Sequence, residues 1–409
     1  MRKIGIEKIN LYPCSLYLDL VKLAQARNLD PQEVVSDYLI ECRSINPPYE
    51  DTVTMGANAA QPILTEEDKK DIGMFIVGTE GSVDFGKPIS TNIHGALGLS
   101  PNVRNYETKH ACYSGVAALD TALNWLAAGT NHGKKALVIS TDFSRMHLSK
   151  KEEFVMGGVA AALVLSDNPK IMEFELEKKG TWTTDVYDTF RPSARDEVGN
   201  NEVSLFSYMD ALEGSFRNYL EHVGTEIDFD TYFKYCVYHT PFPGIAFQAH
   251  RTLCNLTRPR KKAEILESFQ EKVVPSLYYA KRTGSTYSSS NFVGICSLLQ
   301  NARDLKPGDR ISFFAYGSGA IGEFYSGRLC PEAKACNVAE TINASLARRK
   351  EVNVQEYEMV EKIRESCIEK PDVTPDFSIL KDWYKTFYEG KGYLVLKKVK
   401  DFYRTYEWS

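Results

Sequence analysis

Residues 110–128 read HACYSGVAALDTALNWLAA, a polar turn followed directly by a run of small and apolar residues. The run from Ser114 to Ala128 is apolar on nearly every face, which is typical of a helix buried between two layers. Cys112 therefore lies just ahead of a helix start, where the helix dipole and unpaired N–H groups lower a thiol pKa and stabilise a thiolate. Most buried cysteines are only small core residues, but this setting predicts a nucleophile.

Short β-branched runs surround this helix on both sides in the sequence. They lack the alternation of a half-exposed sheet, so we predict buried strands of a layered α/β protein. The predicted strands cover residues 73–79, 135–141, 159–166, 171–177, 235–240, 311–319 and 322–329. Amphipathic spacing also predicts a helix from Pro31 to Arg43.

The length of 409 residues exceeds what one hydrophobic core usually serves, so we expect two packed halves. The turn signal Asp167-Asn168-Pro169 places the boundary between residues 1–167 and residues 168–409. The polar, aromatic-rich stretch 181–224 suits an excursion that covers an active site. The tail from residue 353 to residue 409 is predicted to be surface structure.

The composition, 43% hydrophobic and 25% charged, is that of an ordinary soluble globular protein. A net charge of -5 gives no reason to expect nucleic-acid binding, and no apolar run is long enough to predict a membrane anchor or signal peptide. The 9 cysteines are scattered without CxxC or Cys/His spacing, which predicts a reducing cytoplasm and no metal site. No flavin or nucleotide motif is present.

Two further residues follow predicted strands and are candidates for chemistry. Glu80 lies in Gly78-Thr79-Glu80-Gly81, where an isolated glutamate is more often a solvated loop carboxylate. His239 lies in YHTPF, and a hydrogen-bonded core histidine is an equally good explanation from spacing alone. Its place between a strand and Pro241 favours a pocket.

The motifs ACYSG, HTPF and YGSG, in this order, resemble the HMG synthase branch of the thiolase superfamily. The resemblance runs through most of the chain and implies a thiolase-like α/β fold of two related halves, layered α-β-α-β-α. It also implies an enzyme that attaches acetyl to a cysteine and adds its enolate to a β-ketoacyl thioester. Cys112 matches the nucleophile, Glu80 the general acid/base and His239 the active-site histidine.

These residue types suit that chemistry. A thiolate accepts an acetyl group with little change in bond energy, and the new thioester acidifies the methyl protons. A carboxylate can remove one of them only if nearby amides stabilise the enolate oxygen. By resemblance, Tyr113, Ser204, Tyr316, Gly317 and Ser318 contact substrate, and the segment from Asp185 to Pro192 matches the family's central segment.

The sequence departs from the family pattern at several positions. In HMG-CoA synthases two lysines that contact coenzyme A follow HTPF, and here Gly244 and Gln248 replace them. Each charge-assisted contact is worth about 1.5–3 kcal/mol, so their loss argues against tight binding of a free coenzyme. Met156 replaces a threonine, and Ser285 replaces an acceptor-binding asparagine, whose role we do not transfer to Asn291.

Together these changes resemble the HMG synthase-like enzymes of polyketide β-branching clusters, of the curacin type. The resemblance implies acetyl-acyl carrier protein as donor and β-ketoacyl-acyl carrier protein as acceptor, with a 3-hydroxy-3-methylglutaryl-type thioester as product. No cofactor is expected on the enzyme, since phosphopantetheine arrives on the carrier. A homodimer is implied by the resemblance alone.

A carrier protein is acidic, so a basic surface is expected to dock it. Arg258, Arg260 and Lys261 lie in the basic run TRPRKK and are candidates, although a solvated basic face is the usual explanation of such a run.

Three other functions compete with this prediction. A mevalonate-pathway HMG-CoA synthase would use the same chemistry with acetyl-CoA. An initiating ketoacyl synthase normally pairs cysteine with histidine and asparagine, and Glu80 argues against it. A non-catalytic carrier-binding scaffold would not need Cys112, Glu80 and His239 together.

Overall fold

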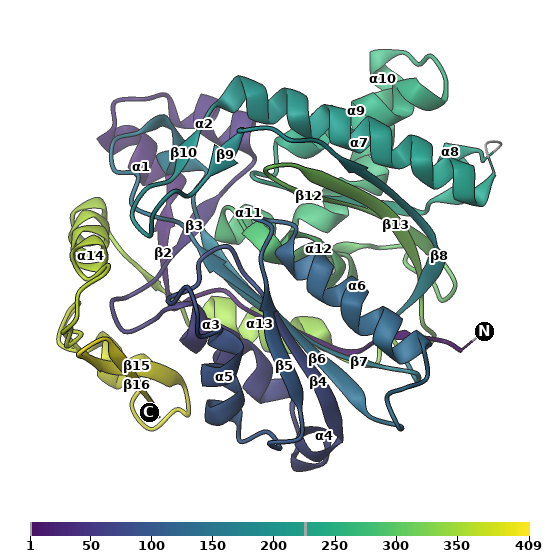
Figure 1. Cartoon of the computed structure of the whole chain (residues 1–409). Helices are drawn as coiled ribbons and strands as arrows, with labels where there is room; N and C mark the ends of the chain where they lie inside the picture. The colour runs from purple at the N-terminus through teal and green to yellow at the C-terminus, as the bar shows by residue number, and fades with distance from the viewer. Residues whose placement is uncertain (1, 225–226) are drawn as a thin grey trace.

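The computed structural model describes residues 2–224 and 227–409, and its centre is a nine-stranded sheet in the order β11-β12-β13-β8-β1-β7-β6-β4-β5 (Figure 1). The strands are β1 (Gly5–Tyr12), β4 (Ile72–Gly78), β5 (Arg104–Thr108), β6 (Lys135–Phe143), β7 (Gly158–Ser166), β8 (Met172–Thr183), β11 (Tyr235–Tyr238), β12 (Arg310–Gly317) and β13 (Ile321–Leu329). Every strand predicted from the sequence is present, with ends shifted by a few residues.

The sheet has two parts that meet at one short contact. β1 pairs with β7 from Gly5 to Tyr12, but with β8 only through Gly5↔Glu173 and Ile6↔Met172. The strands on one side of this contact end by Ser166, and those on the other begin at Met172. The predicted boundary falls in the connection between them, and the division into halves 1–167 and 168–409 stays a prediction.

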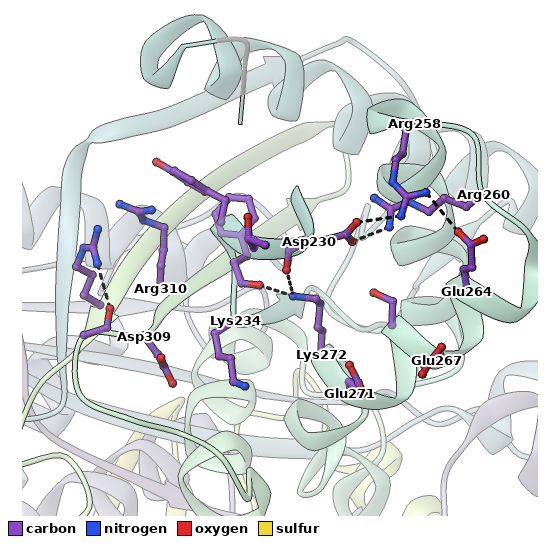
Figure 2. Close-up of a pocket in the computed structure, with 16 residues that line it drawn as sticks. Asp230, Lys234, Arg258, Arg260, Glu264, Glu267, Glu271, Lys272, Asp309 and Arg310 are labelled. Atoms are coloured by element: carbon purple, nitrogen blue, oxygen red, sulfur yellow. Dashed lines mark hydrogen bonds and ion pairs between the residues drawn. The ribbon is translucent and has the colours of Figure 1, made fainter. Parts of the chain in front are cut away.

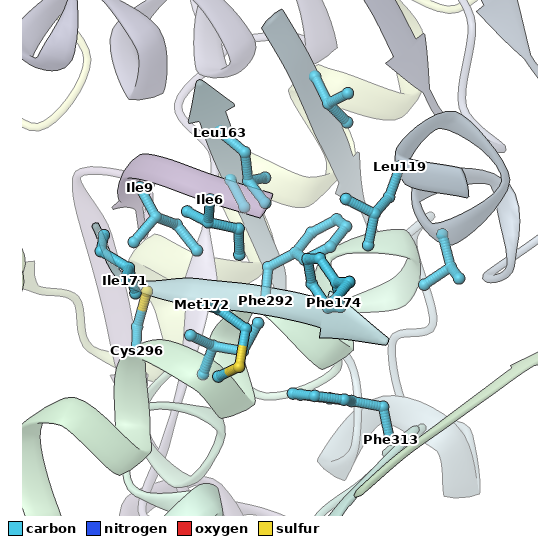
Figure 3. Packing of buried hydrophobic residues seen from close by; sticks show 14 of the residues in the cluster. Ile6, Ile9, Leu119, Leu163, Ile171, Met172, Phe174, Phe292, Cys296 and Phe313 are labelled. Carbon is cyan, nitrogen blue, oxygen red and sulfur yellow. The ribbon is translucent and has the colours of Figure 1, made fainter. Parts of the chain in front are cut away.

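Helices form the layers above, between and below the two parts of the sheet. In the middle, α6 (Ser114–Ala127) and α12 (Ser290–Asn301) share one hydrophobic cluster with strands of both parts, and this cluster includes Leu119, Phe292 and Phe313 (Figure 3). On the outer faces lie α3 (Thr52–Ala60) and α5 (Ile89–Leu97) on one side, and α7 (Asn201–Val223), α9 (Ile245–Thr257) and α10 (Lys262–Lys272) on the other. The predicted α-β-α-β-α layering is confirmed.

The strands β4 and β7 are apolar along almost their whole length because both of their faces are buried. In β4, Met74 and Ile76 join the central cluster, whereas Phe75 and Val77 join the outer cluster with α3 and α5. Successive side chains of a strand point to opposite faces, so a strand between two helical layers cannot carry a polar face.

A smaller sheet holds the beginning and the end of the chain together. Its strands β2 (Leu16–Asp19), β3 (Cys42–Ile45) and β14 (Lys350–Glu351) lie in the order β14-β2-β3. The helix predicted from Pro31 to Arg43 is shorter: α2 (Pro31–Tyr38) stops where Leu39 turns left-handed at φ 54°. The prediction was wrong beyond this point because residues 42–45 pair with β2.

The prediction that residues 353–409 are surface structure was also wrong. Tyr357, Val360, Tyr388 and Val395 are buried in one cluster with Leu16, Leu18 and other residues of the first 50. The tail contains α14 (Val354–Ser366), α15 (Trp383–Phe387), β15 (Leu394–Lys400) and β16 (Tyr403–Trp408). It follows α13 (Val338–Ala347), whose Val338 and Ile342 pack in the central cluster instead. The burial arises from contacts about 300 residues apart in sequence, which local sequence patterns do not reveal.

The excursion predicted for 181–224 contains regular structure. β8 extends to Thr183, a short hairpin follows with β9 (Thr189–Phe190) and β10 (Val198–Gly199), and Asn200 caps α7.

The remaining helices are α1 (Leu20–Ala26), α4 (Glu66–Asp71), α8 (Phe229–Tyr232) and α11 (Ala280–Thr283). Within residues 2–224 and 227–409, no helix has the length and apolarity needed to cross a membrane.

Candidate active site

The candidate residues gather at the carboxyl ends of parallel strands. β4 is parallel to both β5 and β6, and β11 is parallel to β12. Glu80 follows β4, Cys112 follows β5 after a short turn, and His239 follows β11. Ligands of open α/β sheets bind at such strand ends, so the predicted positions at strand and helix ends agree with the structure.

Cys112 and Glu80 are in direct contact. The Cys112 thiol donates a hydrogen bond to Oε2 of Glu80 at 3.5 Å. Ala111, immediately before the cysteine, has a left-handed φ of 43°. This conformation costs a residue with a Cβ about 1–2 kcal/mol, and such strain is typical of functional sites.

The expected lowering of the Cys112 pKa was wrong. Burial, followed by the charges of Glu80 and Asp142, raises the pKa of the Cys112 thiol well above its usual value, although Arg191 opposes the rise. α6 begins at Ser114, two residues later, so the cysteine does lie beside a helix start, but burial and the two carboxylates set the direction of its pKa. The resting cysteine is therefore a thiol hydrogen-bonded to Glu80, and the thiolate forms when that proton moves.

Glu80 is a buried carboxylate held between charges. Its Oε1 lies 2.8 Å from Nη2 of Arg191, and its backbone N–H donates to Oδ1 of Asp142 at 2.9 Å. Burial, together with the charges of Asp142 and Glu197, raises the pKa of Glu80 to about 7, although Arg191 and the hydrogen bond from Cys112 oppose the rise. A carboxyl group with this pKa can both accept and donate a proton near neutral pH.

Asp142, which the sequence analysis did not single out, organises the floor of the site. Besides the Glu80 amide, it accepts hydrogen bonds from Thr79 Oγ1 at 2.7 Å, from the Ser288 amide at 3.3 Å and from the Ser288 hydroxyl. It lies near the end of β6, directly after the predicted strand 135–141. The signal in the sequence that could have identified Asp142 is that its carboxylate directly follows a predicted buried strand, as the carboxylate of Glu80 does.

His239 is buried, with 2% of its surface exposed, and its Nε2 has no hydrogen-bond partner among the described residues. Its backbone is fixed: its N–H donates to Phe314 O at 2.7 Å, and its carbonyl accepts from the Tyr208 hydroxyl at 2.7 Å. Burial lowers the pKa of His239 to about 3, so the ring is neutral at pH 7. A neutral imidazole with a spare nitrogen can hydrogen-bond a substrate carbonyl.

Tyr316 and Gly317 connect the histidine to the nucleophile. The Tyr316 ring centroid is 6.3 Å from that of His239, and its hydroxyl donates to Oδ2 of Asp188 at 2.6 Å. A Cβ at Gly317 would lie 2.5 Å from the His110 carbonyl oxygen, so the YGSG loop packs directly on the loop of Cys112. Asp188 also accepts the Gly319 amide at 2.9 Å.

The other predicted substrate contacts are less central. The Tyr113 hydroxyl donates to the buried Glu323 within the fold. Ser204 is half-buried in the first turn of α7, three residues before Ser207, whose hydroxyl lies 3.0 Å from that of Tyr316. Ser318 follows Gly317 in the same loop. The substrate contacts of these residues stay predictions.

Gly244 and Gln248 lie at the start of α9. Gly244 caps this helix with an ordinary φ of -61°, so its backbone does not require glycine. The available space does require glycine, because a Cβ at this position would lie 2.2 Å from the Asp37 carbonyl oxygen at the end of α2. The Gly244 amide donates to Tyr38 O at 3.0 Å. The end of α2 therefore occupies the place where a side chain at position 244 would begin.

Two of the three predicted carrier-docking residues, Arg258 and Arg260, line a surface depression of about 930 Å³ (Figure 2). Arg260 is held inside the fold, with 3% of its side chain exposed and Nη1 2.6 Å from Oδ1 of Asp230. Arg258 pairs with Asp230 and Glu264 at 3.2 and 3.3 Å but is half-exposed. Lys261 is exposed at the start of α10. Docking stays a prediction for Arg258 and Lys261, whereas the contacts of Arg260 are structural.

A layered α/β protein in which a cysteine, a glutamate and a neutral histidine each follow the carboxyl end of a parallel strand is typical of the condensing enzymes of the thiolase-like class. Family comparisons agree: the model described as "Hydroxymethylglutaryl-coenzyme A synthase N terminal" matches residues 1–169, and its C-terminal counterpart matches residues 248–408. The chain belongs to the hydroxymethylglutaryl-CoA synthase family.

Relatives cover the whole chain. It is 35% identical to the polyketide biosynthesis 3-hydroxy-3-methylglutaryl-ACP synthase PksG of Bacillus subtilis, over 100% of both chains. It is 33% identical to a hydroxymethylglutaryl-CoA synthase of Enterococcus faecalis, over 87% of this chain and 90% of the other. The crystal structure of the curacin pathway HMG synthase with acetyl donor-ACP matches with a TM-score of 0.94 at 38% identity, over 100% of both chains. The predicted thiolase-like fold is confirmed.

Proposed function

We propose that this enzyme condenses a Cys112-bound acetyl group with a β-ketoacyl-acyl carrier protein to give a 3-hydroxy-3-methylglutaryl-type thioester, as in polyketide β-branching. The contact of the Cys112 thiol with Glu80, at 3.5 Å, supports this chemistry above all else. The donor in the proposal is acetyl-acyl carrier protein. Relatives named for an ACP-linked product, or solved with donor-ACP, support this choice.

In the first half-reaction Glu80 acts as a proton shuttle. It takes the proton of the Cys112 thiol as the sulfur attacks the donor thioester carbonyl and forms the new C–S bond. The bond to the donor sulfur breaks, and the departing phosphopantetheine thiolate takes the proton back from Glu80. The raised thiol pKa is no obstacle, because the base is already hydrogen-bonded to the sulfur.

In the second half-reaction the same carboxylate removes a proton from the methyl group of acetyl-Cys112. The enolate carbon attacks the ketone carbon of the acceptor, a C–C bond forms, and the resulting alkoxide takes the proton from Glu80. Water then adds to the Cys112 thioester, and the C–S bond breaks as one water proton passes to the sulfur and restores the thiol. The other proton is released to solvent, and the product leaves with a free carboxylate. Neutral His239 holds a substrate carbonyl through its unpartnered nitrogen, the only unpartnered imidazole nitrogen buried among the described residues.

The surroundings of Gly244 support a tethered donor over a free coenzyme. The end of α2 leaves no space for a side chain at 244, and Gln248 is uncharged, so two cations expected to bind a free coenzyme are missing. A phosphopantetheine tethered to a carrier gains binding from the carrier surface instead. No resident cofactor is part of the proposal.

Rates of acylation from two donors test the donor assignment. The enzyme is mixed with acetyl-carrier protein or with acetyl-CoA at equal concentration, and intact-protein mass spectrometry follows the added acetyl group on Cys112. We expect faster labelling from the carrier protein. Equal or faster labelling from acetyl-CoA would reject carrier specificity and favour a mevalonate-pathway enzyme.

We also propose a homodimer that forms through the edge of the main sheet. β5 pairs with β4 alone among the strands described, which leaves one row of backbone groups unpaired. Such edges associate readily, and Phe85, in the loop after Glu80, is 95% exposed. Light scattering at micromolar concentration should give twice the chain mass of 46.1 kDa.

A cytoplasmic location is part of the proposal, supported by 9 free cysteines, since such thiols persist in a reducing compartment.

A further inference from the structure

Arg191 brings a buried cation to the general base from a distant segment. It lies in the loop between β9 and β10, and only 13% of its side chain is exposed. A single nitrogen, Nη2, lies 2.8 Å from Oε1 of Glu80 and 3.0 Å from Oε2 of Glu197. The guanidinium carbon lies 5.7 Å from the ring centroid of Tyr287.

The other nitrogens of this guanidinium show what holds it in place. Nε and Nη1 are buried, and no described residue accepts a hydrogen bond from them. Arg260, by contrast, donates a hydrogen bond from Nε to the Cys254 carbonyl at 3.1 Å. The polar partners of Arg191 are instead two carboxylates, so charge fixes its position.

The carboxylates need this cation. Asp142 and Glu197 lie close enough to Glu80 for their charges to raise its pKa, and burial raises the pKa of both Glu80 and Asp142. The groups that face Glu80 or Arg191 are Cys112, Asp142, Arg145, Glu197 and Tyr287. Of the described residues, Arg191 is the cation in direct contact with Glu80.

The two oxygens of Glu80 have different partners. Oε1 faces Arg191, whereas Oε2 accepts the thiol of Cys112. Because the ion pair takes one oxygen, the carboxylate cannot rotate freely about its last bond. The oxygen that exchanges protons therefore stays directed at the cysteine.

We propose that Arg191 is a positioning residue of the condensation: it favours the ionised form of Glu80 and directs Oε2 toward the acyl group on Cys112. The proposal rests on the proposed role of Glu80 as base. It gives the 184–200 segment a part in the chemistry beyond covering the site.

Exchange of the acetyl methyl protons tests the proposal. Acetyl-Cys112 enzyme, loaded from whichever donor is effective, is placed in deuterated buffers from pH 5 to 9, and mass spectrometry follows deuterium uptake. Arg191→Met should move the pH midpoint of exchange up by about one to three units. Exchange at pH 6.5 should then fall roughly tenfold or more and recover at high pH. Glu197→Gln removes a neighbouring negative charge and should move the midpoint down.

Arg195→Met is the matched control. Arg195 lies four residues along the same segment, is 40% exposed, and pairs with Glu365 and Glu369 at 3.7 and 3.6 Å. Its loss should leave the midpoint unchanged. Arg191→Lys keeps the charge without the planar guanidinium and should give an intermediate midpoint, which separates charge from loss of packing if the methionine variant is unstable.

Alkylation of unacylated Cys112 by iodoacetamide gives a second readout. Arg191 lowers the pKa of this thiol, so Arg191→Met should move the alkylation profile to higher pH. Lower exchange at every pH with an unmoved midpoint would mark Arg191 as merely structural and reject the proposal, as would an unchanged profile. If Glu80→Gln still exchanges normally, the role of Glu80 itself fails, an outcome distinct from failure of the Arg191 proposal.

Discussion

Oε2 of Glu80 accepts the hydrogen bond of the Cys112 thiol at 3.5 Å, while Oε1 of the same carboxylate pairs with Arg191. One carboxylate therefore stands ready for both proton transfers that the proposed reaction needs near the cysteine. The pKa of Glu80 near 7 matches this double use, since a group half-ionised at the working pH gives up and regains protons with little driving force.

Replacing Cys112 with serine should abolish thioester labelling by any acetyl donor, because a hydroxyl is a much poorer nucleophile at neutral pH. The change is small in volume, so stability should change by about 1 kcal/mol or less. Intact-protein mass spectrometry and thermal unfolding measure the two effects. Cys336→Ser, which removes an exposed free cysteine, should label normally, and an acetyl group on another cysteine in Cys112→Ser would refute the assignment.

Glu80→Gln should abolish deuterium exchange into acetyl-Cys112 and yield no condensation product. Acylation should also slow, by about a hundredfold, because the thiol loses the base that accepts its proton. Quenched-flow labelling measures acylation separately from exchange. Glu213→Gln, at an exposed ion pair with Arg217, serves as control, and unimpaired exchange in Glu80→Gln would mean that another group is the base.

Gly244→Ala should destabilise the protein by about 1–3 kcal/mol, because the added methyl meets backbone at Asp37 that cannot move alone. Thermal unfolding measures this cost, and a variant as stable as the parent would show that α2 does not restrict position 244.

Gln248→Lys adds a cation at a half-buried position. It should raise the rate of acylation by acetyl-CoA several-fold relative to acetyl-carrier protein.

Glu50 should make the stability of the protein fall as pH rises. Its carboxylate is buried and accepts the hydroxyls of Tyr12 and Tyr388, and burial raises the pKa of Glu50 from 4.5 to about 7. Because the folded state holds this proton more tightly, the contribution is complete below pH 4.5 and is lost through pH 7. The loss is about 3 kcal/mol over this window.

Calorimetry from pH 5 to 8.5 measures the effect as the difference between the parent and Glu50→Gln, whose side chain stays neutral. The variant should lose less stability as the pH rises. Parallel curves for the two proteins would show that Glu50 does not titrate with a raised pKa.

The parts of the fold and site that follow from local sequence were predicted. Strands such as 73–79 are apolar because both faces are buried, and Cys112, Glu80 and His239 stand where strands or helices end. Arg191 lies within the segment from Asp185 to Pro192, but its role could not be predicted, because its pairing with Glu80 joins positions 111 residues apart. The buried tail and the raised pKa of Cys112 depend on packing and charges brought together only by the fold.

The contact of Gly244 with the Asp37 carbonyl also constrains how this protein can evolve. A lysine at 244 would meet a main-chain atom, so no single substitution nearby can relieve the clash. A lineage returning to a nucleotide-bearing donor would first have to shorten or redirect residues 31–39, a change that brings no benefit until the lysine follows. The change in residues 31–39 and the lysine at 244 are therefore epistatic, and the donor preference in this branch should reverse only rarely.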